Sequence, residues 1–298
     1  MSSETGFPEK IGGIGHLREP FRTAFRSEIG QGEPVKALIY SPPFSTASFK
    51  AAASVMAVTA DRWVIAWEQD RQFRMEAADF SDTLLIELTI ILLYGQLKVD
   101  FVKEGTPVSV AVYFNTVKEK YYQEAMESLL AGIATESKAR RQAGEINARV
   151  IRDWPLKFRN VALMYSPAGR QLIAGLYWDA LYGSGNREIF PACALLRTEK
   201  ELLLITEEKL SGRFHLHRDQ KLGEIITYVP LAHLAGYRIL ERPRVDTLSL
   251  LVHAGYGGET LDIAFPKEQR ARVLDLMRSI MRASPLSARA ADADGSIR

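Results

Sequence analysis

The sequence has little of what a disulfide framework or a cysteine-based metal site needs. It contains one cysteine, Cys193, in 298 residues. One thiol cannot form an intrachain disulfide or supply a Cys-based zinc site, and this usage is typical of a reducing compartment. An excess of charge of one sign is also lacking, because 38 Lys and Arg stand against 36 Asp and Glu. The resulting net charge of +2 gives no reason to expect nucleic acid as a partner.

Long hydrophobic runs are absent as well. The N-terminus has no basic segment followed by an apolar one, so we expect no signal peptide. The most apolar stretch, residues 84–94, is interrupted by Glu87 and Thr89 and is far shorter than the ~20 residues of a membrane-spanning helix. We expect a buried strand there and no transmembrane segment. The expected location is cytoplasmic, with peripheral attachment to a membrane as the alternative.

The sequence does contain a repeat. Its length of 298 residues suits two domains of ordinary size. Residues 37–42 (ALIYSP) recur as 162–167 (ALMYSP), with five of six residues identical at an offset of 125. Further matches follow in the same order, at offsets of 139, 154 and 151: 59–65 with 198–204, 76–80 with 230–234, and 114–130 with 265–281. Matches in conserved order predict two copies of one domain, at 34–135 and 160–282.

The periodicity changes once inside each copy. In the first copy, turns separate short β-rich runs, which we expect to form an antiparallel meander: 55–67, 83–94, 96–102 and 108–114. Apolar residues then recur at helical spacing from Tyr122 to Ile133, after a capping box of Thr116 and Glu119. In the second copy, the helical stripe recurs from Val273 to Met281. The pattern predicts a mainly β fold in which a C-terminal amphipathic helix closes each barrel or sandwich.

This layout resembles a known family of domains. The residues that carry the resemblance are the turn and strand at 59–67, the strand at 95–101, and the segment 112–117 that leads into the last helix. Each copy is similar to a pleckstrin-homology-like (PH-like or GRAM-like) domain of the bacterial type. The resemblance implies two tandem PH-like barrels. It also implies a scaffold that binds lipid headgroups, peptides or other proteins, and seldom a catalyst.

Three segments lie outside the two copies. In the leader, residues 1–33, apolar and basic residues each recur every fourth position: Leu17, Phe21, Phe25 and Ile29, beside Arg18, Arg22 and Arg26. A short helix with these two stripes could lie on an anionic membrane, but more often packs its apolar ridge on the adjoining domain.

We expect the connector 136–159 to be helical and basic, since 136–160 holds seven basic and three acidic residues, a net +4. The tail 283–298 lacks apolar periodicity and is predicted to be disordered.

The candidate binding residues are basic ones in segments that the β cores do not need. They are Arg140 and Arg141 in the connector, and Arg213, His215, His217, Arg218 and Lys221 in an inserted run. On a strand, His215 and His217 would share one face and could share a metal, although a third ligand is missing nearby. An exposed hairpin, or a basic loop that docks an anionic partner, are the other interpretations of this run.

No nucleophile, base and oxyanion arrangement can be recognised in the sequence, so we name no catalytic residue. We therefore favour a non-catalytic binding or scaffold protein with no cofactor and no metal. Its expected partner is an anionic protein face or lipid surface, and self-association through exposed strand edges is a further expectation. The alternative is a metal-dependent protein or enzyme that uses His215 and His217.

Overall fold

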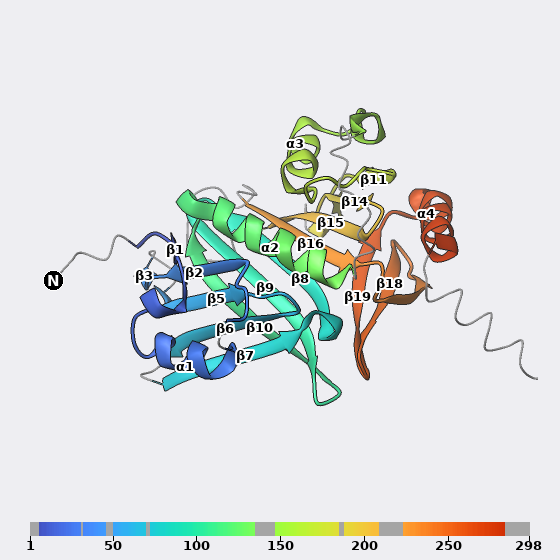
Figure 1. Ribbon diagram of the computed structural model, residues 1–298. Helices are drawn as coiled ribbons and strands as arrows, with labels where there is room; N and C mark the ends of the chain where they lie inside the picture. Colours follow the sequence, from blue (N-terminus) through green and yellow to red (C-terminus); the bar gives the residue numbers. More distant parts are fainter. Residues whose placement is uncertain are drawn as a thin grey trace, which may run out of the picture.

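The computed structural model describes residues 6–30, 32–45, 50–69, 72–134, 147–184, 188–208 and 223–283. Figure 1 shows that these residues form a mainly β structure with helices packed on its sheets. Two short hairpins, β3–β4 (Phe44–Ser45 and Lys50–Ala51) and β12–β13 (Leu181–Tyr182 and Glu188–Phe190), accompany three larger sheets. All pairings are antiparallel, which confirms the predicted class, and the described strands close no barrel.

The first sheet has five strands and carries the N-terminal helix on its outer face. Its order is β1 (Glu9–Lys10), β2 (Ala37–Ser41), β5 (Ser54–Val58), β6 (Arg62–Gln69) and β7 (Gln72–Asp79). Helix α1 (Phe21–Glu28) packs on this sheet, and the four apolar residues of the leader are at most 3% exposed: Leu17, Phe21, Phe25 and Ile29. The prediction that this ridge packs within the molecule is confirmed. A buried ridge is not available to a membrane surface.

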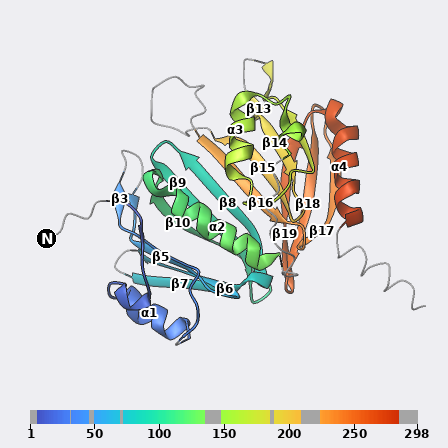
Figure 2. The same ribbon diagram turned by 45° about the horizontal axis from the view of Figure 1, so that its top comes forward.

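The second sheet joins the two halves of the chain. Its order is β10 (Thr106–Asn115), β9 (Tyr94–Lys103), β8 (Thr83–Ile91), β16 (Gly223–Pro230), β15 (Glu201–Glu208), β14 (Cys193–Arg197) and β11 (Ala174–Trp178). The halves meet where β8 pairs with β16, from Ile91 opposite Gly223 to Ile86 opposite Tyr228. Helices α2 (Glu119–Ile133) and α3 (Leu156–Tyr165) cover one face of this sheet and share one apolar core (Figure 2).

The third sheet closes the other face. Its order is β17 (Leu234–Glu241), β18 (Asp246–Ala254) and β19 (Gly257–Phe265), followed by helix α4 (Arg270–Ala283). Apolar residues of this sheet and of α4 form a second core with the strands of the larger sheet, as Leu248, Met277 and Leu204 show. Leu84 and Leu85 at the start of β8 enter this second core, whereas Ile86 and Leu88 enter the first. The predicted buried strand at 84–94 is confirmed for residues 84–91, but Leu92 and Leu93 are exposed in the following turn and Tyr94 begins β9.

Local patterns predicted most elements of the first half correctly. The helix from Tyr122 to Ile133 is α2, and the run 55–67 is divided into β5 and β6 by a turn. The predicted capping box is wrong. The Asn115 side chain accepts the amide of Val117 at 3.0 Å, while the Thr116 hydroxyl donates to the carbonyl of Leu92 at 2.6 Å. Asn115 can cap because it lies one residue before the 3-10 turn that opens the helix.

The element order occurs twice. With the short hairpins β3–β4 and β12–β13 left out of the count, a first unit runs from α1 through four strands, three strands and α2, and a second unit runs from α3 through four strands, three strands and α4. The turns before β6 and β15 share one backbone hydrogen bond, because the Thr59 amide donates to the Arg62 carbonyl and the Thr198 amide to the Glu201 carbonyl, both at 2.9 Å. This turn confirms the predicted match of 59–65 with 198–204.

The C-terminal half of each unit follows the predicted offset of 151. Phe114 lies opposite Gly95 and Phe265 opposite Asp246 in the corresponding strand pairs. In the helices, Met126 and Met277 are 1% and 0% exposed. The predicted match of 114–130 with 265–281 is therefore confirmed.

Two of the predicted matches are wrong. Residues 37–41 are strand β2, whereas 162–165 lie in helix α3, where Phe158, Ala162 and Tyr165 are buried at helical spacing. The counterpart of β2 is β11, which begins 137 residues later. The predicted match of 76–80 with 230–234 is off by three residues. Asp79 lies opposite Arg62, and Pro230 lies opposite Glu201, the counterpart of Arg62. Pro230 is therefore the counterpart of Asp79, at an offset of 151. The offset rises from 139 to 151 between Glu208 and Gly223, which places twelve additional residues in that segment.

We expect Leu129→Ala in α2 to lower the free energy of unfolding by about 2–5 kcal/mol, because Leu129 is fully buried and its truncation leaves a cavity. Urea unfolding of the full chain measures this change. Lys120→Ala, on the exposed side of the same helix, is the control and should leave the midpoint nearly unchanged. A Leu129→Ala midpoint no lower than that of the control would contradict the packing described for α2.

Candidate functional site

The predicted binding residues all lie outside the described residues: Arg140, Arg141, Arg213, His215, His217, Arg218 and Lys221. The inserted run is flanked by Glu208 and Gly223, which pair with each other, and Gly223 also lies opposite Ile91 at the end of β8. The connector begins soon after Ala134, at the end of α2. Gly132 in this last turn of α2 lies against the ring of Phe80, and Phe80 lies shortly before the start of β8. The two basic segments therefore leave the described structure at opposite ends of β8.

The described histidines show no sign of a metal site. No cluster of three His, Cys, Asp or Glu suited to a metal ion occurs among the residues that the structure describes. His233 Nδ1 lies 2.7 Å from the carbonyl oxygen of Thr83, and burial lowers the pKa of this imidazole. Because Thr83 begins β8 and His233 precedes β17, this hydrogen bond joins the two units.

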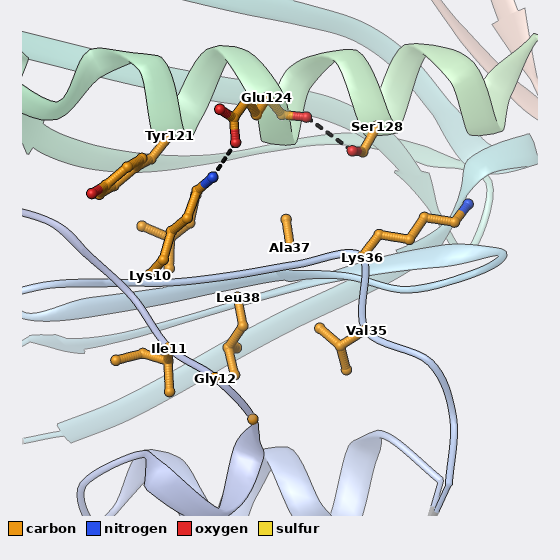
Figure 3. A pocket seen from close by; sticks show the side chains of 12 residues that line it. Lys10, Ile11, Gly12, Val35, Lys36, Ala37, Leu38, Tyr121, Glu124 and Ser128 are labelled. Atoms are coloured by element: carbon orange, nitrogen blue, oxygen red, sulfur yellow. Dashed lines mark hydrogen bonds and ion pairs between the residues drawn. The ribbon is translucent and has the colours of Figure 1, made fainter.

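A pocket of about 270 Å³ lies between the β1–β2 edge and helix α2 (Figure 3). Lys10 forms an ion pair with Glu124, and its ammonium group is 5.0 Å from the centre of the Tyr121 ring. The Ser128 hydroxyl donates to the carbonyl of Glu124 at 2.9 Å and is not paired with a base. The pocket can hold a small ligand by hydrogen bonds, but these contacts provide no activated nucleophile. The sequence did not indicate it, because β1 is only two residues long.

A second polar cluster lies where the two units meet. It consists of Glu87 on β8, Lys98 and Asp100 on β9, and Glu259 on β19. Glu87 is directly opposite Lys98 in the strand register. The ammonium of Lys98 lies 3.2 Å from Asp100 Oδ2 and 3.6 Å from Glu87 Oε2. The hydroxyl of Ser109 on β10 donates a short hydrogen bond to Asp100.

Charge in this cluster is incompletely balanced, because one ammonium group serves three carboxylates. Burial, together with the charge of Asp100, raises the pKa of Glu259 to about 7, although Lys98 opposes the shift. Glu259 Oε1 is buried and has no hydrogen-bond partner among the described residues. Burial also raises the pKa of Glu87. The cluster can therefore exchange a proton near neutral pH, but the Ser109 hydroxyl beside Asp100 already donates to that carboxylate.

The sequence contained one signal for this cluster. Glu87 interrupts the most apolar run of the chain, and a carboxylate in a strand buried on both faces requires a partner. The local pattern could not identify Glu259 as a neighbour, because β19 reaches β9 only through the contact between the two units.

No known protein family and no curated protein matches this sequence. Within the part of the chain that the structure describes, no helix combines the length and apolarity needed to cross a membrane. The proposal of function therefore depends on the fold and on these local geometries.

We expect Glu259→Gln to stabilise the protein at pH 8 relative to wild type and to have little effect near pH 5. With a native pKa of about 7 against an ordinary 4.5, unfolding releases a proton between these values, so wild-type stability falls as pH rises through this window. Gln cannot ionise and avoids that loss. Urea midpoints at pH 5 and pH 8 measure it, with exposed Glu268→Gln as control. An equal difference from wild type at both pH values would contradict the assignment.

Proposed function

We propose that this chain is a non-catalytic binding or scaffold protein built from two PH-like units, and that it engages an anionic protein face or lipid surface. The observation that supports the proposal best is the repeated order of four strands, three strands and a C-terminal helix. This order is typical of PH-like domains, whose scaffold usually serves binding.

The junction between the units supports a scaffold role. Strands β8 and β16 form one continuous sheet, and α2 and α3 share the core beneath it. At the other side, the β18–β19 turn fits closely against the first unit, since a Cβ on Gly257 would lie 2.8 Å from Val102 and 2.9 Å from the Gly105 carbonyl oxygen. The continuous sheet on one side and the tight turn on the other hold the two units at a fixed spacing, which suits a protein that presents two surfaces to one partner.

The state of the potential nucleophiles supports a non-catalytic role. The Cys193 thiol is buried, and burial raises its pKa well above the ordinary value, so it stays protonated. The Ser41 hydroxyl is 2.6 Å from the Tyr122 hydroxyl in a buried pair. Neither residue lines the pocket between the β1–β2 edge and α2.

The distribution of basic residues supports an anionic partner. Both predicted segments carry arginines that the apolar cores do not require. Helix α4 adds a described set on its exposed side: Arg272, Arg278 and Arg282. Basic side chains clustered away from the core attract anionic surfaces at low ionic strength.

We expect replacement of Arg140, Arg141, Arg213 and Arg218 by Ser to reduce recovery on vesicles that contain anionic lipid, and to reduce capture of partners from a lysate. Single surface contacts of this kind contribute ~0–1 kcal/mol, so the effect should require all four changes together. Vesicle flotation and pull-down at low and moderate salt measure it.

The matched control replaces the same four arginines by Lys, which keeps the charge and should retain binding. Neutral vesicles control for adsorption that does not depend on charge. Equal recovery of wild type and the Ser variant under both salt conditions would contradict an anionic partner at these residues.

A further inference from the structure

The pairing of β8 with β16 joins strands that hold different places in the two units. β16 is the fourth strand of the second unit, and β8 is the fifth strand of the first unit. Gln72 and Gly223, which begin the two fourth strands, are 151 residues apart, as are Thr83 and Leu234, which begin the two fifth strands. Both fifth strands also have a bulge over their first residues, between Thr83 and Leu85 and between Leu234 and Gly236. The equivalence is therefore exact at the level of individual residues.

The remaining fourth strand and the remaining fifth strand lie at sheet edges. Strand β7, the fourth strand of the first unit, ends the five-stranded sheet, and β17, the fifth strand of the second unit, ends the three-stranded sheet. Among the described strands, each pairs on one side only. Within the described part of the chain there is therefore one filled junction between a fourth and a fifth strand, and one open edge of each kind.

We propose that a second copy of this chain pairs its β7 with the β17 edge of the first, in the antiparallel register that β16 and β8 use. Within the chain, Thr227 lies opposite Glu87 and Ile226 opposite Leu88. Translation by 151 residues places Glu76 of one copy opposite Arg238 of the other, and Met75 opposite Ile239. At these two positions the register brings an acidic residue against a basic one and an apolar residue against an apolar one, whereas Phe73 falls opposite Glu241 and Arg74 opposite Leu240.

The apolar faces of the two edges also agree with this arrangement. In the filled junction, Ile226 and Leu88 enter one core, which contains α2 from one unit and α3 from the other. Met75 packs toward α1, the counterpart of α3, and Ile239 packs toward the core that contains α4, the counterpart of α2. Pairing would bring these two apolar surfaces to the same side of the combined sheet, as in the chain itself.

The contact between copies should be weaker than the junction within the chain. Inside the chain, the Tyr165 hydroxyl donates to Glu119 at 2.7 Å and the Ala168 amide to Glu127 at 3.3 Å, which ties α3 and its following turn to α2. The counterparts of Glu119 and Glu127, 151 residues later, are Arg270 and Arg278, which cannot accept such bonds. Association therefore depends on strand pairing and on protein concentration. Because the two surfaces differ, the contact is head-to-tail and builds an open series or a ring.

Disulfide trapping between two different variants of the full chain tests the proposal. Opposed residues of antiparallel strands bring Cα atoms within disulfide reach. We expect a mixture of Glu76→Cys and Arg238→Cys chains, oxidised at high protein concentration, to give a covalent dimer that neither variant gives alone. The native Cys193 is buried and should not contribute. The control mixture pairs Arg238→Cys with Gln72→Cys, which lies four residues away on the same strand and should give much less product.

Equal dimer yields from the two mixtures would overturn the proposal and would leave Arg238 as a charge that protects an edge from pairing. A cross-link that appears only after removal of residues 284–298 would assign the β17 edge to the chain's own tail, and would also overturn it. None of the cysteine positions is among the arginines tested for anionic partners. Loss of that binding would therefore leave this result unaffected.

Discussion

The antiparallel pairing of β8 with β16 is the interaction on which the rest of the structure depends. Six residue pairs connect strands that lie more than a hundred positions apart in the sequence, and the pairing removes what would otherwise be two exposed edges. At its start β8 is apolar on both faces, because Leu84 and Leu85 enter one core while Ile86 and Leu88 enter the other. The most hydrophobic run of the sequence is therefore the strand at which the two units become one body.

The same pairing creates the polar cluster. On an isolated first unit, one face of β8 and β9 would be open to water, and Glu87 opposite Lys98 would be an ordinary exposed cross-strand pair. The second unit lays β19 across this face and brings Glu259 toward charges that are already present. Burial disfavours the ionised form of Glu259, and the nearby Asp100 increases that effect. The raised pKa of Glu259 is thus a consequence of the packing between the two units rather than of either unit alone.

How much could be predicted from the sequence follows from the range of the interactions involved. The turn at Thr59, the helix that contains Met126 and their counterparts in the second unit are set by neighbours within a few residues, and their patterns were interpreted correctly. The match of 37–42 with 162–167, with five of six residues identical, is misleading, because a six-residue segment is compatible with strand or helix and its tertiary contacts decide. The pairing of β8 with β16 and the approach of Glu259 depend on distant contacts, which local patterns do not contain. The predicted basic residues lie outside the described structure, so their positions remain predictions.

The edge strands β7 and β17 carry charged residues at positions whose counterparts in the β16–β8 pairing are one neutral and one charged residue. Inside the chain, Glu87 faces the neutral Thr227, because the covalent connection already fixes partner and register. At the ends, the equivalent positions hold Glu76 and Arg238, and Glu76 already forms an ion pair with Lys103 at 2.7 Å. Charged residues on an edge strand oppose pairing with unrelated strands, since a desolvated charge without a partner is costly. In the proposed register Arg238 gains a carboxylate partner in Glu76, whereas Glu76 already has Lys103, so the charge of Arg238 is the one that favours this partner strand over an uncharged one.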